Sequence, residues 1–381
     1  MGFKQSVRLL LLAIAAWASA PVCAAVVEHL YHVQITPTEG QSRDDALREA
    51  SVIMFQRLAG SDLQVSKGAV AKALSAPQEL MRRIGSVDNG GIRIEFEPEA
   101  VNAALAAAGK PVLGRNRPGI LFWVVEKSAL GDERLSPVSS WALLLKEAAA
   151  HRAVALNFPL GDLQDLSGVS DEDVLQANKQ SLIEASERYP SEGTLALTID
   201  GSTDSAVLDW TLWLNEQDKS GRATGTAAEA ADALMMALAN AVFEQYALPA
   251  ATADDLTGWQ LHVEGIDSVA AYSGLTRMLR QLGSQQQPKL LAIDGSTLVL
   301  QIKFPGDEAQ LVRMLSLDSR LQRTSAPEPE IEAVEVIESA EHAASHSENN
   351  DQLASSDQLA EPAQPVASAP AVPTLYFRWR Q

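Results

Sequence analysis

The chain has 381 residues and is 46% hydrophobic, so it is long and apolar enough to form two or three domains with cores of their own. Its formal net charge of -19 excludes an ordinary nucleic-acid-binding protein, because such proteins need clustered Lys and Arg to displace counterions from phosphates. The same charge disfavours adhesion to anionic lipid.

The N-terminus has the pattern of a cleavable export signal. Lys4 and Arg8 form a basic start, residues 9–20 form an apolar stretch, and residues 18–25 are mostly small. The apolar stretch is shorter than the roughly 20 residues that span a bilayer. We therefore expect a signal peptide over residues 1–24.

Removal of that signal predicts the location and redox state of the product. Cleavage near Ala24 or Ala25 would release a soluble protein into the periplasm or the medium, with no transmembrane span left after signal removal. The single cysteine, Cys23, would be discarded with the signal, so we expect no disulfide and no thiol chemistry.

The first folded unit is expected at residues 25–111, as an α+β domain. Ser42, followed three residues later by Asp45, is typical of a helix start, and Gly60 of a helix end. Hydrophobic periodicity predicts the order strand, helix, helix, strand, helix at residues 28–36, 43–59, 70–84, 92–96 and 98–108.

The middle unit is expected at residues 112–250. Strands interleaved with helices favour an α/β sandwich with a mixed sheet. Thr226 and Glu229 form a capping-box pattern before a long Ala-rich helix that runs to Tyr246. The other predicted elements are a strand at 119–126, helices at 140–152 and 171–189, and strands at 194–200, 207–215 and 221–225.

The third unit is expected at residues 254–323. The order β-α-β-β-α, with residues 320–323 available as a last strand, predicts a ferredoxin-like βαββα(β) domain. The predicted elements are a strand at 259–263, a helix from Asp267 to Gly283, a hairpin of 290–293 with 298–304, and a helix at 307–315.

The end of the chain changes character twice. Residues 324–373 consist mainly of Ala, Ser, Glu, Gln and Pro, which predicts a disordered acidic segment. Residues 374–381 are again aromatic and β-prone. We expect this end to dock as a strand, preferably on the third unit; the alternative is a docking motif for a partner, and its anchors are Leu375, Tyr376, Phe377 and Trp379.

Candidate chemistry is sparse. His29 and His32 would project from opposite faces of a strand, which does not suit a shared metal ion. The chain lacks a nucleophile elbow and a glycine-rich phosphate loop. Four loop acids lack the spacing of a calcium loop. We expect no catalytic residue, no cofactor and no metal; the four acids are Asp162, Asp165, Asp171 and Asp173.

Two arginines are the best candidates for a site. Arg117 and Arg188 each lie beside a predicted strand, and Arg188 is followed by Tyr189. A bidentate contact to Asp162 or Asp173 would make them structural ion pairs that fix a loop. The alternative is that the two arginines bind an anionic ligand.

Several motifs together resemble an uncharacterised family of exported bacterial proteins, the domain of unknown function 2066. The resemblance implies a secreted or periplasmic protein and no assigned activity. The motifs are Arg43-x-x-Ala46-Leu47-x-x-Ala50, Arg57-Leu58-x-Gly60, Gly114-x-x-Arg117-Pro118, Leu121-x-Trp123, Pro159-Leu160-x-Asp162-Leu163, Asp173-Val174, Ala185-Ser186-x-Arg188-Tyr189 and Trp210-x-Leu212.

The sequence therefore favours an exported envelope accessory protein that binds or assembles with another envelope protein. A periplasmic protein that binds a small molecule or a peptidoglycan fragment is the second hypothesis, and an enzyme is the third. The identity of the partner and the oligomeric state stay open at this stage.

Overall fold

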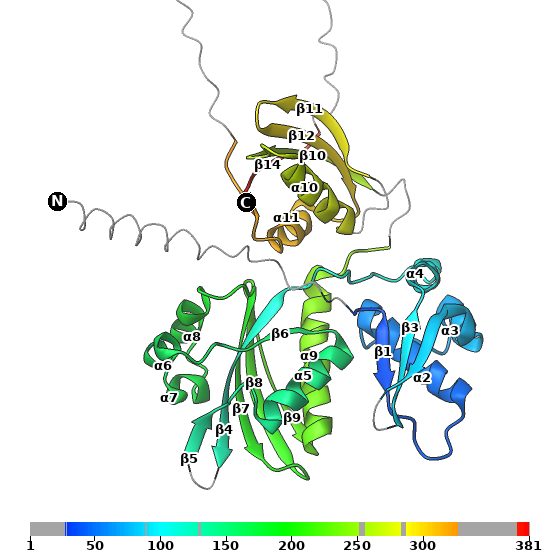
Figure 1. Cartoon of the computed structure of the whole chain (residues 1–381), viewed down its shortest axis with the longest axis vertical. Coiled ribbons are helices and arrows are strands. Elements are labelled where there is room, and N and C mark those ends of the chain that lie inside the picture. The colour runs from blue at the N-terminus through cyan, green and yellow to red at the C-terminus, as the bar shows by residue number, and fades with distance from the viewer. Residues whose placement is uncertain are drawn as a thin grey trace, which may run out of the picture.

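The computed structural model describes residues 27, 29–87, 90–128, 131–250, 256–282, 287–326 and 372–380. The predicted signal peptide lies outside these residues, as do residues 327–371 of the predicted acidic segment. The described chain forms three units, each with its own sheet (Figure 1).

The first unit packs its helices against an antiparallel sheet with strand order β1-β3-β2. Ser42 accepts the Asp45 amide and so caps the first of these helices. The unit consists of β1 (His32–Ile35), α2 (Arg43–Ala59), α3 (Gly68–Ser75), the 3-10 helix η1 (Pro77–Leu80), β2 (Met81–Ser86), β3 (Ile92–Phe96) and α4 (Pro98–Ala107).

The predicted helix at 70–84 is wrong in its second half. The helix ends at Ser75, Pro77 opens a 3-10 turn, and Met81–Ser86 pairs with β3 as strand β2. Proline cannot donate the hydrogen bond that a continuing helix needs, and it crowds the preceding turn. The strand then gains its own bonds from a partner that lies later in the chain.

The middle unit is a mixed sheet with strand order β5-β4-β7-β8-β9, and a short strand, β6, also pairs with β4. The pairings of β4 with β6 and β7 are parallel, and the others are antiparallel. Its elements are β4 (Gly119–Ser128), β5 (Gly131–Arg134), α5 (Ser140–Arg152), β6 (Ala155–Asn157), α6 (Leu163–Gly168), α7 (Asp171–Leu175), α8 (Lys179–Ser186), β7 (Gly193–Gly201), β8 (Ala206–Leu214), β9 (Gln217–Gly225) and α9 (Ala227–Tyr246).

Helices cover both faces of this sheet. One face packs on α5 and α9, and the other packs on α7 and α8, next to α6 (Figure 1). The predicted single helix at 171–189 is divided into α7 and α8, because Ala177 between them has a φ of 48°, outside the helical range.

The third unit has a sheet with strand order β11-β12-β10-β14-β13. Without β14 this order is that of a ferredoxin-like βαββαβ domain, as the sequence predicts. Its elements are β10 (Thr257–Glu264), α10 (Val269–Gln281), β11 (Lys289–Asp294), β12 (Thr297–Phe304), α11 (Glu308–Ser316), β13 (Leu321–Arg323) and β14 (Thr374–Trp379).

Strand β14 lies between β10 and β13, although about fifty residues of chain separate it from β13. It runs parallel to β10 and antiparallel to β13. Leu375, Phe377 and Trp379 are buried beneath the helices, and Arg320 lies over the Trp379 ring at 4.6 Å. Tyr376 projects from the other face, where its ring lies 4.9 Å from that of His262.

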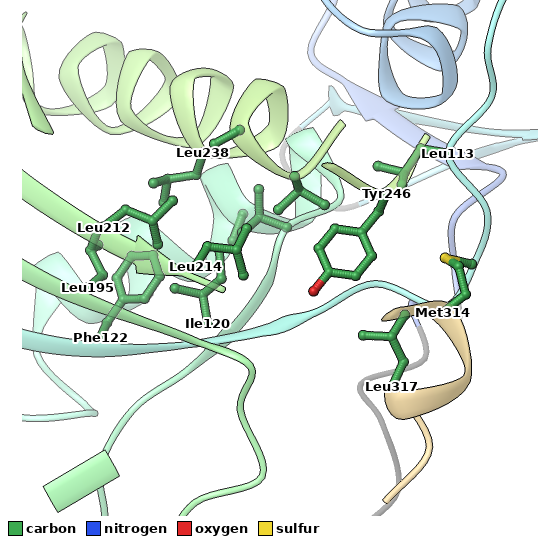
Figure 2. Close-up of a cluster of buried hydrophobic side chains, with 14 of the residues drawn as sticks. Leu113, Ile120, Phe122, Leu195, Leu212, Leu214, Leu238, Tyr246, Met314 and Leu317 are labelled. Atoms are coloured by element: carbon green, nitrogen blue, oxygen red, sulfur yellow. The ribbon is translucent and has the colours of Figure 1, made fainter. Parts of the chain in front are cut away.

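The hydrophobic core runs without interruption from the middle unit into the third. Figure 2 shows Tyr246, at the end of α9, between leucines of the middle sheet and Met314 and Leu317 at the end of α11. Arg313 of α11 also donates to the Gln245 carbonyl at 2.9 Å. The two units therefore share a packed junction.

The expected fold class, a multidomain α/β protein with mixed sheets, is confirmed. In the part of the chain that the structure describes, no helix combines the length and hydrophobicity needed to cross a bilayer.

Candidate functional site

Arg188 and Asp162 form a bidentate ion pair beside α6. The two terminal nitrogens of Arg188 donate to the Asp162 carboxylate at 2.9 and 2.6 Å, and one also reaches Asp165 at 3.2 Å. Asp162 accepts the Asp165 amide at 3.0 Å as well, so the same carboxylate caps α6. Parallel N–H···O bonds of this kind fix orientation in addition to supplying attraction.

Asp165 is the buried centre of this network, with 1% of its side chain exposed. It accepts the Tyr189 hydroxyl at 2.5 Å and the Gly161 amide at 2.8 Å. The Tyr189 oxygen in turn accepts the Leu160 amide at 2.9 Å. Residues 160–165 are therefore bound to the turn that follows α8 by side chains rather than by a strand ladder.

Arg134 at the end of β5 holds the other end of α6. It donates to the Val169 carbonyl at 2.7 Å and to the Asp171 carboxylate at 3.0 Å, and its guanidinium lies over the Trp123 ring at 5.6 Å. A cation near the last carbonyls of a helix is favourable, because those groups have no partner within the helix.

Electrostatics agree with this geometry. The hydrogen bond from Arg188 lowers the pKa of Asp162 to about 2. Burial raises the pKa of Tyr189 to about 12, and its bond to Asp165 adds to the shift. At neutral pH the aspartate is charged and the phenol is neutral, which are the states that the hydrogen bonds require.

Three leucines project into solvent from this fixed segment. The exposed fractions are 73% for Leu160, 82% for Leu163 and 59% for Leu166. Leu163 and Leu166 are three residues apart on α6 and so share a face. We call these three residues the leucine patch. A cluster of exposed apolar side chains with a charged rim is typical of a surface that contacts another molecule.

Two of the five predicted site residues lie elsewhere. Arg117 is 2% exposed and donates to three backbone carbonyls, those of Gly114, Ala153 and Arg57, at 3.2, 2.9 and 2.7 Å. Burial lowers its pKa to about 9, so it stays charged at neutral pH. Arg117 therefore joins the first unit to the middle unit at the end of α5.

Asp173 completes the capping box at the start of α7 together with Ser170. It accepts from Ser170 and Asn178, and the Ser170 bonds lower its pKa to about 2. Arg188 contacts Asp162, one of the two acceptors that the sequence suggested, and Tyr189 joins the same network through Asp165. In the sequence, Asp165 stands out only as one of four loop acids that lack the spacing of a calcium loop. The signal for Asp165 was its position three residues after Asp162, the spacing of a helix cap.

The four predicted docking residues at the end of the chain also have structural positions. Leu375, Phe377 and Trp379 are 4%, 0% and 5% exposed within the sheet of their own unit. Tyr376 is the half-buried member of the four. The three buried side chains are thus core residues of the third unit.

A cavity of about 470 Å³ lies at the junction of the middle and third units. Glu192 lines it and accepts the Gly119 amide at 2.6 Å; burial raises the pKa of this carboxyl. Tyr246 and Arg313 also line it, and at its rim Arg323 pairs with Glu308 at 2.8 Å. Among the described residues, no group of three or more His, Cys, Asp or Glu side chains is arranged to hold a metal ion.

Of the three units, the first matches a known sequence family. Residues 24–114 match the sequence model of a domain of unknown function, DUF8605. The expected membership of the domain of unknown function 2066 family is therefore wrong, because the matching family is a different one. No curated protein matches the chain, and no solved structure matches it.

Proposed function

We propose that this chain is an exported envelope accessory protein and that the leucine patch binds an apolar surface of another envelope protein. The observation that carries this proposal is the fixed exposure of Leu160, Leu163 and Leu166 by the Asp165 network. The proposed location is the periplasm, and the basic and apolar pattern of residues 1–24 supports it.

A protein surface suits the patch better than a lipid surface does. Asp162 and Arg188 border the leucines, which gives the polar rim and apolar centre of a protein interface. The net charge of -19 opposes binding to anionic lipid. A preformed patch also avoids the ordering cost that a mobile loop would incur on binding.

Site-directed crosslinking in intact periplasm tests the proposal. A photoreactive group placed at Leu160 of the full chain should give a discrete protein adduct. The adduct should disappear when Leu163→Ser and Leu166→Ser are combined. Leu143→Ser is the matched control, because Leu143 is 60% exposed on α5, which packs on the opposite face of the sheet. The same adduct with all three proteins would refute the leucine patch as the binding surface.

The junction cavity supports a second function, the binding of a small polar ligand such as a peptidoglycan fragment. Its volume falls within the range of ligand pockets, and Glu192 supplies a half-buried carboxyl that can accept a hydrogen bond. Arg117 and Arg188 do not support this function, since backbone carbonyls and aspartates already occupy them. Titration with a defined muropeptide, compared between wild type and Glu192→Gln, tests it; no heat signal with wild type would exclude that ligand class.

A further inference from the structure

Strand β11 is an edge of the third sheet, and its side chains are unusually apolar for an edge. It pairs only with β12 among the described strands, and all six of its residues are exposed. Leu290, Leu291 and Ile293 are 37%, 45% and 63% exposed. Native proteins normally protect an apolar edge strand from pairing with other chains, because its free N–H and C=O groups act as a template.

A bulge places two of these side chains on one face. Leu290 lies opposite Leu300 and Ile293 lies opposite Leu298, and both partners point toward the helices. The register shifts between Leu290 and Ala292, where Leu291 is the extra residue of a bulge. Because of this extra residue, the side chain of Ile293 lies on the same face of the sheet as that of Leu290. The helix-side face of β11 is therefore apolar at both ends.

Helix α10 also carries exposed apolar side chains. Val269 and Tyr272 are 84% and 38% exposed. They lie on the flank of α10 away from Gly274, the residue that faces Trp379 of β14. The Ile266 amide donates to the Ser296 carbonyl at 2.9 Å, which joins the segment before α10 to the turn after β11.

The order of residues in β11 is complementary to itself. The strand reads Lys289-Leu290-Leu291-Ala292-Ile293-Asp294. In an antiparallel pair of two copies, centred between Leu291 and Ala292, Lys289 lies opposite Asp294 of the second copy. Leu290 lies opposite Ile293 in the same pairing, and these two already share a face. Residues that oppose each other in an antiparallel pair must share a face, so register, charge and face agree.

From this agreement we propose that β11 pairs with β11 of a second copy of the chain. The two five-stranded sheets then join into one, with Leu290 and Ile293 of both copies side by side on its helix-covered face. The contact is isologous, so one twofold axis creates both Lys289–Asp294 pairs. A second copy is favoured over a foreign strand because the charge order of β11 matches its own reversal. This proposal is independent of the leucine patch.

Sedimentation equilibrium of the signal-free chain tests the pairing by charge exchange. We expect a concentration-dependent dimer in the wild type. Lys289→Asp should place aspartates opposite aspartates, Asp294→Lys should place lysines opposite lysines, and each should weaken dimerisation at least about tenfold. An equal mixture of the two variants should form a heterodimer, and the double variant K289D/D294K should dimerise like the wild type.

Lys303→Asp is the matched control, because Lys303 is an exposed lysine on the neighbouring strand β12, away from the edge. It should leave the dimer constant unchanged. All three substituted positions are exposed, so unchanged thermal midpoints will show that each of the four variants is folded. A wild-type monomer at about 100 µM overturns the proposal. A dimer that is insensitive to both single substitutions overturns it as well.

Hydrogen exchange supplies a second readout. The outward amides of residues 289–294 should gain protection as the protein concentration rises, whereas β13 at the opposite edge should not. Concentration-independent exchange in β11 of a dimeric sample would show that the copies meet elsewhere, against the proposal.

Discussion

The roles of three arginines of this chain follow from the kind of hydrogen-bond acceptor that each one contacts. Arg188 pairs with carboxylates and holds a loop. Arg57 and Arg117 bond to backbone carbonyls instead and are almost fully buried. Burial lowers the pKa of Arg57 to about 10, and repulsion from Arg152 adds to the shift. A buried guanidinium needs several acceptors, and the end of α5 offers carbonyls without a helical partner.

Asp162 predicts a dependence of stability on acid. Its pKa in the folded chain is about 2, below the ordinary 3.8, so its contribution is full above pH 3.8 and is lost as pH falls toward 2. Asp162→Asn should therefore lower the thermal midpoint at neutral pH and flatten its decline between those two values. Midpoints measured by circular dichroism over this range check the slope.

The matched control for that experiment is Asp204→Asn, an exposed position in the turn between β7 and β8. It should reproduce the wild-type slope, because it removes an aspartate without removing the Arg188 pair. If Asp162→Asn also follows the wild-type slope, the Arg188 pair does not contribute to acid stability.

At the scale of elements, β14 shows how a distant segment completes a sheet. Its two neighbours are β10, more than one hundred residues earlier, and the short strand β13. Gly265, with a φ of 83°, lies so close to the Trp379 carbonyl that an added Cβ would be 2.6 Å from that oxygen. The turn after β10 is therefore shaped to admit the last strand, and a truncation before residue 374 removes an interior strand.

Phe377→Ala should destabilise the third unit. Phe377 is fully buried, and removing a buried phenyl ring costs about 3 to 5 kcal/mol. Tyr376→Ala, one residue away on the exposed face, should cost no more than about 1 kcal/mol. Denaturant unfolding with a probe in the third unit measures both. Equal losses from the two substitutions would contradict the buried position of β14.

The same reasoning explains which elements could be predicted. The helix that starts at Ser42 and the one that starts at Thr226 were predicted because cap and periodicity are local signals. Strand β2 was missed because most of its residues are exposed and do not alternate, and its partner β3 defines it. Strands β5 and β6 are three or four residues long and likewise depend on β4.

At the scale of the whole molecule, a cluster of charges joins the first unit to the middle unit. Arg57 donates to the Leu30 and His32 carbonyls of the first unit and to the Ala150 and His151 carbonyls of the middle unit. Behind it, Asp232 of α9 accepts from His151 and Arg152. Although burial opposes its charge, these bonds lower the pKa of Asp232. The end of α5 is thus bound both to the first unit, through Arg57, and to α9, through Asp232.

Arg57→Met should uncouple these two units. It leaves four carbonyls without this donor, and breaking a buried charged contact costs about 3 kcal/mol or more. In a calorimeter the first unit should then melt before the middle unit, whereas in the wild type the two should melt together. Arg277→Met, an exposed position on α10, is the control. A single unchanged transition in Arg57→Met would show that the apolar contacts alone couple the units.

The sequence by itself determined the local features of this protein: its helix caps, the order of most strands and helices, its acidity and the ferredoxin-like pattern of the third unit. Tertiary structure alone decided the acceptors of Arg117, the buried position of Asp165 and the insertion of β14 between β10 and β13. Local features depend on backbone dihedrals and on side chains a few residues apart. The others depend on hydrogen-bond partners and apolar neighbours tens to hundreds of residues away, which only the packed chain brings together.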